Sequence, residues 1–232
     1  MQCHVEYRET PTGKHFLNYT VSGSRATPFG RSLVELRRVA GYIEVLVKVF
    51  PPGPRVDRAT IHNDPMEALK WMADEYLIVK ICAFLGVWEG IRREIALRNG
   101  GTDVLRKLRP ITAELKRNRE RFRRYRNKLV AHGQDRDEVK HPNWWVLRDK
   151  LPVRHADTIF MALLCINLMA RLATVYEQEM VYAKDEESVV DATLRPFIRQ
   201  KLDANPLKDG ADVGKALQQI VDQVAVPPLI QS

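Results

Sequence analysis

The chain has 232 residues, of which 45% are hydrophobic and 28% are charged, a balance typical of a folded globular protein and unlike that of a disordered one. Its three cysteines are odd in number and far apart, which argues against a disulfide framework and favours a reducing compartment. Polar and charged residues interrupt the longest apolar stretches, so we expect no membrane span and a cytoplasmic location.

The first 30 residues differ in pattern from the rest of the chain. Two short runs alternate between apolar and polar residues and favour β-strands, His4–Tyr7 and Phe16–Val21. The sequence Thr10-Pro11-Thr12-Gly13 between them is rich in turn-forming residues. Residues 1–30 are therefore predicted to form an N-terminal extension with a β-hairpin.

Four long stretches with apolar residues at helical spacing then predict an antiparallel helical bundle over residues 31–183. The expected helices are Arg31–Phe50, Pro65–Arg98 after an N-cap at Asp64, a third from caps at Thr102 and Asp103 to Ala131, and Asp157–Ala183. The middle of the second helix, Tyr76–Trp88, is apolar on most sides and is expected at the centre of the core.

A polar loop containing Trp144 and Trp145 is expected between the third and fourth helices. The tail, residues 184–232, holds two shorter helical patterns, Glu186–Leu202 and Asp209–Val224, predicted to be accessory helices. The sequence thus predicts an all-α protein in three parts: residues 1–30, 31–183 and 184–232.

Positive charge is concentrated in the third predicted helix. Of the thirteen residues from Lys116 to Lys128, eight are Lys or Arg. Residues 105–128 carry eleven cations and two glutamates, a net charge of +9, while the whole chain carries +8, so the rest sums to about −1. Like charges at helical neighbour spacing repel one another, which favours a polyanionic partner over a general role in solubility.

A heptad-like seam runs along the same helix through Leu108, Ile111, Leu115, Asn118, Phe122, Tyr125 and Leu129. Extending this seam by three residues reaches His132, which is expected on the inward or interface side of the helix. Arg126 lies about a fifth of a turn from the middle of the seam, whereas Asn127 points almost opposite to it. A joint role for Asn127 and His132 would require a distorted helix end, a second subunit or a bond through Arg126.

Two interpretations of His132 remain open from the spacing. A histidine on a seam is more often a satisfied core residue than a catalytic one. This histidine, however, ends the most cationic segment of the chain, and the coincidence favours a phosphate-handling site. Metal ligation is poorly supported, because Cys3, His4 and His15 form no standard zinc-ligand spacing. We expect no metal and no cofactor.

The heptapeptide from Arg126 to His132 has the sequence RNKLVAH. It resembles the signature of the HEPN superfamily, and in particular that of its abortive-infection-type branch. In that signature an Arg and a polar residue are followed at short spacing by a His. The resemblance covers roughly residues 31–183. It implies a helical bundle and a metal-independent endoribonuclease whose active site is composed at a homodimer interface, often in a bacterial toxin–antitoxin or antiviral defence system.

Carried over to this chain, the resemblance implies that Arg126 neutralises the scissile phosphate, that His132 transfers protons, and that Asn127 orients one of them. Further cations of the same helix would bind RNA, namely Arg119, Arg123, Arg124 and Lys128. Two alternatives remain: a non-catalytic relative that binds RNA or nucleotides, and an all-α module whose basic helix binds an acidic protein. An antitoxin is a further expected partner.

Overall fold

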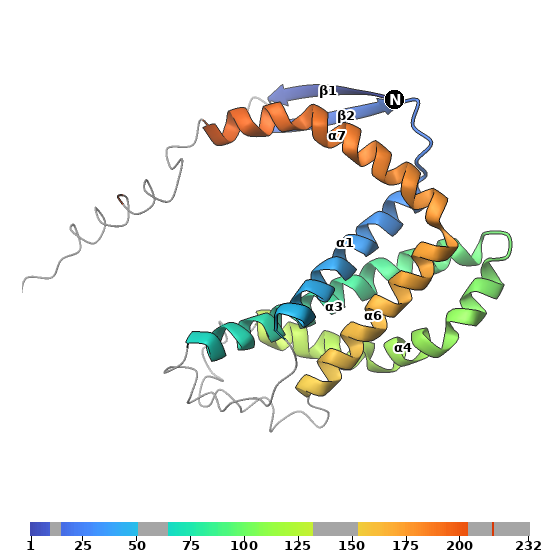
Figure 1. Cartoon of the computed structure of the whole chain (residues 1–232), viewed down its shortest axis with the longest axis vertical. Coiled ribbons are helices and arrows are strands. Elements are labelled where there is room, and N and C mark those ends of the chain that lie inside the picture. Colours follow the sequence, from blue (N-terminus) through green and yellow to red (C-terminus); the bar gives the residue numbers. More distant parts are fainter. Residues whose placement is uncertain (10–14, 51–64, 132–152, 204–214, 216–232) are drawn as a thin grey trace, which may run out of the picture. The chain divides into compact units, whose positions relative to one another are not determined.

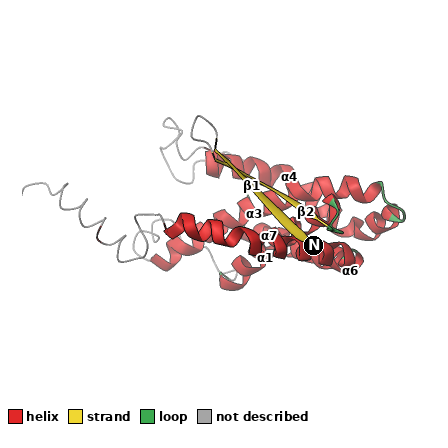
Figure 2. Cartoon of the chain, turned by 90° about the horizontal axis from the view of Figure 1, so that it is seen from above, coloured by secondary structure: helices red, strands yellow, loops and turns green. Residues whose placement is uncertain are grey.

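The computed structural model describes residues 1–9, 15–50, 65–131, 153–203 and 215, and most of them are helical (Figures 1 and 2). The elements in chain order are β1 (Gln2–Glu9), β2 (His15–Ser22), α1 (Pro28–Val49), α3 (Pro65–Ala96), α4 (Gly101–Ala131), α6 (His155–Val175) and α7 (Glu177–Asp203). The predicted all-α class with an N-terminal hairpin is confirmed. The chain divides into two compact units, Arg25–Lys184 and a second made of Met1–Ser24 with the residues from Asp185 onward.

The hairpin pairs β1 with β2 in antiparallel register, from Gln2 opposite Ser22 to Glu9 opposite His15. Its predicted turn lies outside the described residues. Gly23 follows β2 with a φ of 73°, a left-handed conformation that glycine adopts without steric cost. In the same unit the hydroxyl of Ser24 donates a hydrogen bond to the carboxylate of Glu186 in α7.

Four helices form the bundle of the larger unit. α3 packs against α1, α4 and α6, while α6 also contacts α1 and α4 (Figure 1). The side chains at its centre are almost fully buried, and they include Leu33, Leu36, Ile43, Ile78, Ile81, Phe84, Leu115, Phe122, Met161 and Leu168. Burial of about ten large apolar side chains at roughly 1.5–3 kcal/mol each is the main stabilising contribution to this unit.

α1 and α4 begin at different places from those predicted. α1 starts at Pro28, three residues early, because the Oγ1 atom of Thr27 accepts a hydrogen bond from the Gly30 amide at 3.0 Å. α4 starts at Gly101, so Thr102 and Asp103 lie in its first turn and do not cap it from outside. Prolines are accommodated inside α4 and α7. The predicted cap at Asp64 lies outside the described residues.

The prediction of one continuous helix over Asp157–Ala183 is wrong. α6 ends at Val175 and α7 begins at Glu177, so the helix is interrupted at Tyr176, which we call the helix break. The Tyr176 ring meets the ring of Phe29 edge-on, with centroids 5.0 Å apart, and this contact holds the break against the start of α1. The apolar spacing continues across the break, which is why the sequence suggested one helix. α7 then includes the predicted helix Glu186–Leu202, while 209–224 lies outside the described residues.

Glu179 ties the break to two other parts of the bundle. Its carboxylate accepts a hydrogen bond from the Thr27 hydroxyl at 2.6 Å and from the Arg98 guanidinium at 2.8 Å. The Arg98 guanidinium also stacks over the ring of Phe29 at 3.8 Å. The hydrogen bond from Thr27, together with Arg98, lowers the pKa of Glu179 below its ordinary value of 4.5. α1 and α7 approach closely here, since a Cβ at Gly30 would lie 2.6 Å from the Glu179 carbonyl oxygen.

The prediction that the middle of α3 lies at the centre of the core holds for one side of the helix. Leu77, Ile81 and Phe84 are buried, whereas Tyr76 is 48% exposed and Gly86 is also at the surface.

Among the described helices, α6 alone has the length and composition that would suit a membrane span, and 39% of its most apolar window is buried in the bundle.

Candidate nucleic-acid interface

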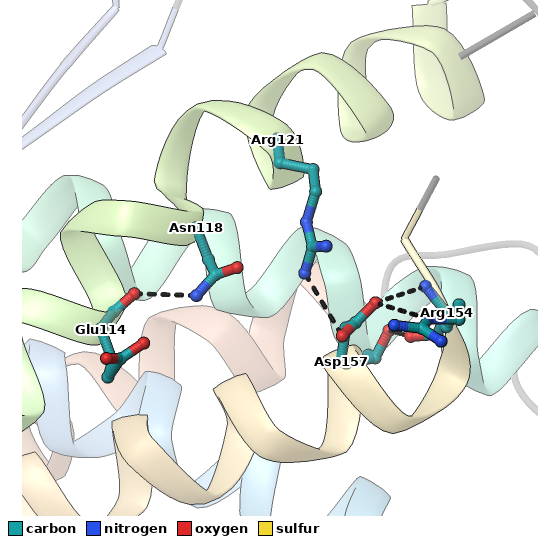
Figure 3. Close-up of polar contacts among 6 residues, drawn as sticks. Glu114, Asn118, Arg121, Arg154 and Asp157 are labelled. Carbon is teal, nitrogen blue, oxygen red and sulfur yellow. Dashed lines mark hydrogen bonds and ion pairs between the residues drawn. The ribbon is translucent and has the colours of Figure 1, made fainter. Parts of the chain in front are cut away.

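The seam of α4 packs into the bundle as the heptad spacing predicts. Leu108, Leu115, Phe122 and Tyr125 are each no more than 3% exposed. Asn118, the polar member of the seam, donates a hydrogen bond from Nδ2 to the Glu114 carbonyl at 3.0 Å, within its own helix (Figure 3). The partner that a half-buried Asn requires is thus supplied locally.

The signature residues begin where this seam reaches the end of α4. Arg126 and Asn127 are both exposed, directly after the buried Tyr125. Burial raises the pKa of the Cys82 thiol in α3 to about 11, and the nearby positive charge of Arg126 opposes that rise. Arg126 therefore lies at the surface on the side of α4 that faces α3. His132 lies outside the described residues.

Three of the eight clustered cations form ion pairs within the bundle. Arg117 pairs with Glu114 in its own helix at 2.8 Å. Arg119 reaches Glu89 of α3 at 2.9 Å. Arg121 reaches Asp157 of α6 at 3.4 Å. Arg119, which is expected to contact RNA, therefore has part of its charge neutralised by the protein itself.

Four other cations of the cluster are exposed and have no ion-pair partner among the residues that the structure describes. They are Lys116, Arg123, Arg124 and Arg126. The side chain of Lys128 is not among those described. An exposed cation without a protein partner is the form in which Lys and Arg bind phosphate oxygens.

Lys116, Arg119, Arg123 and Arg126 follow one another at intervals of three, four and three residues, so they share one side of α4. We call this row the cation ridge. Its contacts place it on the α3 side of the helix, because Arg119 pairs with Glu89 and Arg126 acts on Cys82. Ten residues of helix give the ridge a length of about 15 Å.

Arg121 lies on the side of α4 opposite the cation ridge. Its side chain points toward Asp157 of α6, with which it forms an ion pair inside the bundle (Figure 3). Its side chain is 22% exposed, and its partner Asp157 also accepts a hydrogen bond from the Arg154 amide at 2.9 Å. The Arg121 Nε atom is buried without a hydrogen-bond partner in the described part of the chain. This residue joins α4 to the first turn of α6, a role that its position in the cation cluster did not reveal.

His155 is the first residue of α6, and its side chain contacts α3. Its Nδ1 atom lies 3.0 Å from Oδ1 of Asp74, a residue of α3 that is 9% exposed. Its Nε2 atom is buried and has no hydrogen-bond partner within the described ranges. The pair joins the start of α6 to α3, where both residues are largely shielded from solvent.

Asn167 and Arg171 of α6 could have supported His132 or marked the edge of the apolar stripe. Both are exposed, and Asn167 donates a hydrogen bond to the Leu163 carbonyl of its own helix at 2.9 Å. Both therefore lie where the apolar side of α6 meets solvent, while a contact with His132 falls outside the described residues. The described residues contain no group of three or more His, Cys, Asp or Glu side chains arranged to hold a metal ion.

A surface hollow of about 360 Å³ lies between α1 and the break that separates α6 from α7. Arg37, Thr174, Glu177 and Lys184 are among its lining residues, and none of the lining residues comes from α4. The hollow is therefore separate from those predicted site residues of α4 whose side chains the structure describes.

Comparisons of the chain with protein families, with curated proteins and with solved structures gave no match.

Proposed function

We propose that this protein is a metal-independent endoribonuclease of the HEPN type, cytoplasmic and active as a homodimer, in a bacterial toxin or phage-defence role. The observation that carries the proposal is the exposure of Arg126 at the end of the cation ridge, without an ion-pair partner among the described residues. An Arg in this condition is ready to bind a phosphate with its planar fork of donors. It also begins the RNKLVAH sequence.

RNA supplies its own nucleophile in this proposal, so the protein has three tasks. A base removes the proton of the 2′-hydroxyl, a cation stabilises the charge on the pentacoordinate phosphorus, and an acid protonates the leaving 5′-oxygen. Arg126 performs the second task. His132 suits proton transfer because the ordinary histidine pKa of about 6.5 lies near physiological pH. Two copies of the chain supply two histidines, one for each proton.

Asn127 has a weaker place in this mechanism. It is exposed, in keeping with the ideal-helix geometry that turns it away from the buried seam. An orienting role for Asn127 therefore requires that it act on the RNA or on the second copy. Lys116, Arg123 and Arg124 hold the RNA backbone beside the reacting phosphate without reading its sequence.

The test is cleavage of a labelled RNA by EDTA-treated protein and by its His132→Ala and Arg126→Ala variants. General acid–base catalysis contributes about 10²–10⁴-fold, so we expect His132→Ala to lose at least about 100-fold in rate. Arg117→Ala is the matched control, because Arg117 is also an exposed cation of α4 but pairs with Glu114 away from the ridge. The proposal fails if the EDTA-treated wild type leaves RNA intact, or if His132→Ala cuts it at the wild-type rate.

A non-catalytic RNA-binding protein is the second candidate, because the cation ridge supports binding without any contribution from His132. It predicts RNA binding that weakens steeply as salt rises, with no cleavage by the wild type. The third candidate, a module that binds an acidic protein, predicts that RNA does not bind at all.

A further inference from the structure

α3 carries a second heptad seam on its outer side, distinct from the side that packs in the core. Seven residues follow one another at alternating intervals of three and four: Leu69, Met72, Tyr76, Val79, Ala83, Gly86 and Gly90. All of them are exposed except Val79, which is half-buried. Leu69, Met72 and Tyr76 are 47%, 65% and 48% exposed. Three heptads of this spacing are typical of a helix that packs against another helix.

The outer seam changes character at Val79. Before that residue its side chains are large, and after it they are Ala83, Gly86 and Gly90. A Cβ atom built at either glycine would meet no atom within 4 Å, so the space above this half is open. One half of the seam therefore presents protruding side chains, and the other half presents a surface that another helix can approach closely.

We infer that a second copy of this chain packs on the outer seam, with the two α3 helices antiparallel about a two-fold axis near Val79. The large half of each copy then covers the small half of the other. A two-fold contact requires a surface that is complementary to itself, and a seam that is large at one end and small at the other meets that condition. A partner of unrelated sequence would give no reason for this symmetry about the midpoint.

The charge of the seam favours self-association in the same way. Each copy carries a net charge of +8, so two copies repel one another unless they meet on a weakly charged face. None of the seven residues is charged. The cation nearest the midpoint, Lys80, has its Nζ atom 4.6 Å from the Tyr42 ring centre and 4.8 Å from that of Tyr76, and these aromatic faces stabilise its charge.

The size of the contact is close to the lower limit for a specific dimer. The seam from Leu69 to Gly90 is about 32 Å long, and a helix–helix contact of that length buries roughly 500–600 Å² on each copy. The exposed Tyr42 of α1, whose ring lies beside Lys80, extends the surface. Val45 and Val49 are also exposed and follow Tyr42 at intervals of three and four residues, so they share its side of α1. The total approaches the roughly 1,200 Å² at which specific interfaces begin.

The interface also determines where the cation ridges of the two copies lie. The significance of that position for RNA cleavage rests on the proposed function. Cys82, on which Arg126 acts, lies three residues from Val79, or about 4.5 Å along the helix. Arg126 of each copy therefore lies near the same level along α3 as the midpoint of the contact. The second copy thus contacts α3 at the same height along the helix as Arg126, the first residue of the RNKLVAH sequence.

The experiment compares two alanines that are both exposed in the middle of a helix. Ala83→Lys places a charge in the outer seam, whereas Ala113→Lys places the same charge on the solvent side of α4. Light scattering coupled to gel filtration, without RNA, should give about 53 kDa for the wild type and for Ala113→Lys, twice the chain mass of 26.7 kDa. Ala83→Lys should halve that mass while keeping the wild-type circular dichroism.

Gly86→Leu is the second variant, because a side chain at this position meets open space in one copy and is a better helix former than glycine. It should also yield a single-chain mass with no loss of helix. A wild-type mass of 26.7 kDa, or dimeric Ala83→Lys and Gly86→Leu, overturns the inference. A dimer that these variants disrupt but that cuts no RNA leaves the interface standing and removes the nuclease. Cleavage by a monomeric wild type overturns the interface and the need for a second copy, and leaves the ribonuclease activity itself standing.

Discussion

Replacing Arg123 and Arg126 together by Gln should reduce the salt dependence of RNA binding by a calculable amount. Both side chains are exposed and lack an ion-pair partner among the described residues, so their loss breaks no ion pair that the structure shows. Each cation that neutralises a phosphate of a single strand contributes about 0.7 to the slope of log affinity against log salt. Two such cations contribute about 1.4.

The assay is fluorescence anisotropy of a labelled single-stranded RNA, with His132→Ala as the background so that the RNA stays intact. Between about 50 mM and about 200 mM salt, a slope smaller by about 1.4 means that the double variant loses about sevenfold less affinity than its parent. Its affinity at low salt should also be lower, because two phosphate contacts are missing.

The matched control replaces Arg106 and Arg117 by Gln. These two side chains are 76% and 72% exposed, but they pair with Asp103 and Glu114 on their own helix. We expect the control to change the slope by less than half as much. Equal changes in the two double variants would show that RNA responds to net charge alone, and no change with Arg123 and Arg126 replaced would remove the cation ridge from RNA binding.

Two further predictions concern the bundle that positions α4. Phe122→Ala removes a side chain that is 0% exposed and should lower the free energy of unfolding in urea by about 3–5 kcal/mol; a loss under about 1 kcal/mol would contradict the packing of the seam. The pKa of Glu179 is lowered by Thr27 and Arg98, so its contribution is present above its ordinary pKa of 4.5 and is lost as pH falls through the lowered value. Glu179→Gln should therefore destabilise the protein more at about pH 7 than at about pH 3, and an equal loss at both would be inconsistent with that linkage.

The sequence correctly predicted those elements whose apolar spacing fits a single type of secondary structure and a single buried side. The seam of α4 has apolar residues on one side and cations on the other, so the buried positions Leu115 and Phe122 could be read directly from the spacing. The hairpin followed from alternation and a turn-rich segment. Helix ends were less predictable, because the start of α1 depends on a hydrogen bond from the Gly30 amide to Thr27.

The sequence could not separate cations that bind the bundle from cations that face solvent. Arg121 and Arg123 differ by two residues, yet the first reaches Asp157 of α6 and the second is exposed. The partner is 36 residues away along the chain, and nothing local marks the pair. The contact between His155 and Asp74 is a similar case, since it joins residues 81 positions apart.

The outer seam of α3 was hidden for another reason. A helix that is apolar on most sides is usually buried on most sides, so the sequence suggested a central position for it. The exposed side is apolar as well, and small residues such as Gly86 and Gly90 leave little signal in a count of hydrophobic positions. Only the burial of each residue in the fold distinguishes the two seams.

Mapping the RNA contact by ultraviolet cross-linking and mass spectrometry tests the central claim most directly. A protease that cuts after acidic residues releases a peptide from Arg121 to Asp135, which holds Arg123, Arg126 and His132 together. We expect most of the cross-linked nucleotide on this peptide, and its loss when Arg123 and Arg126 are replaced by Gln. Cross-links confined to other parts of the chain would contradict the claim that RNA binds where the cation ridge ends.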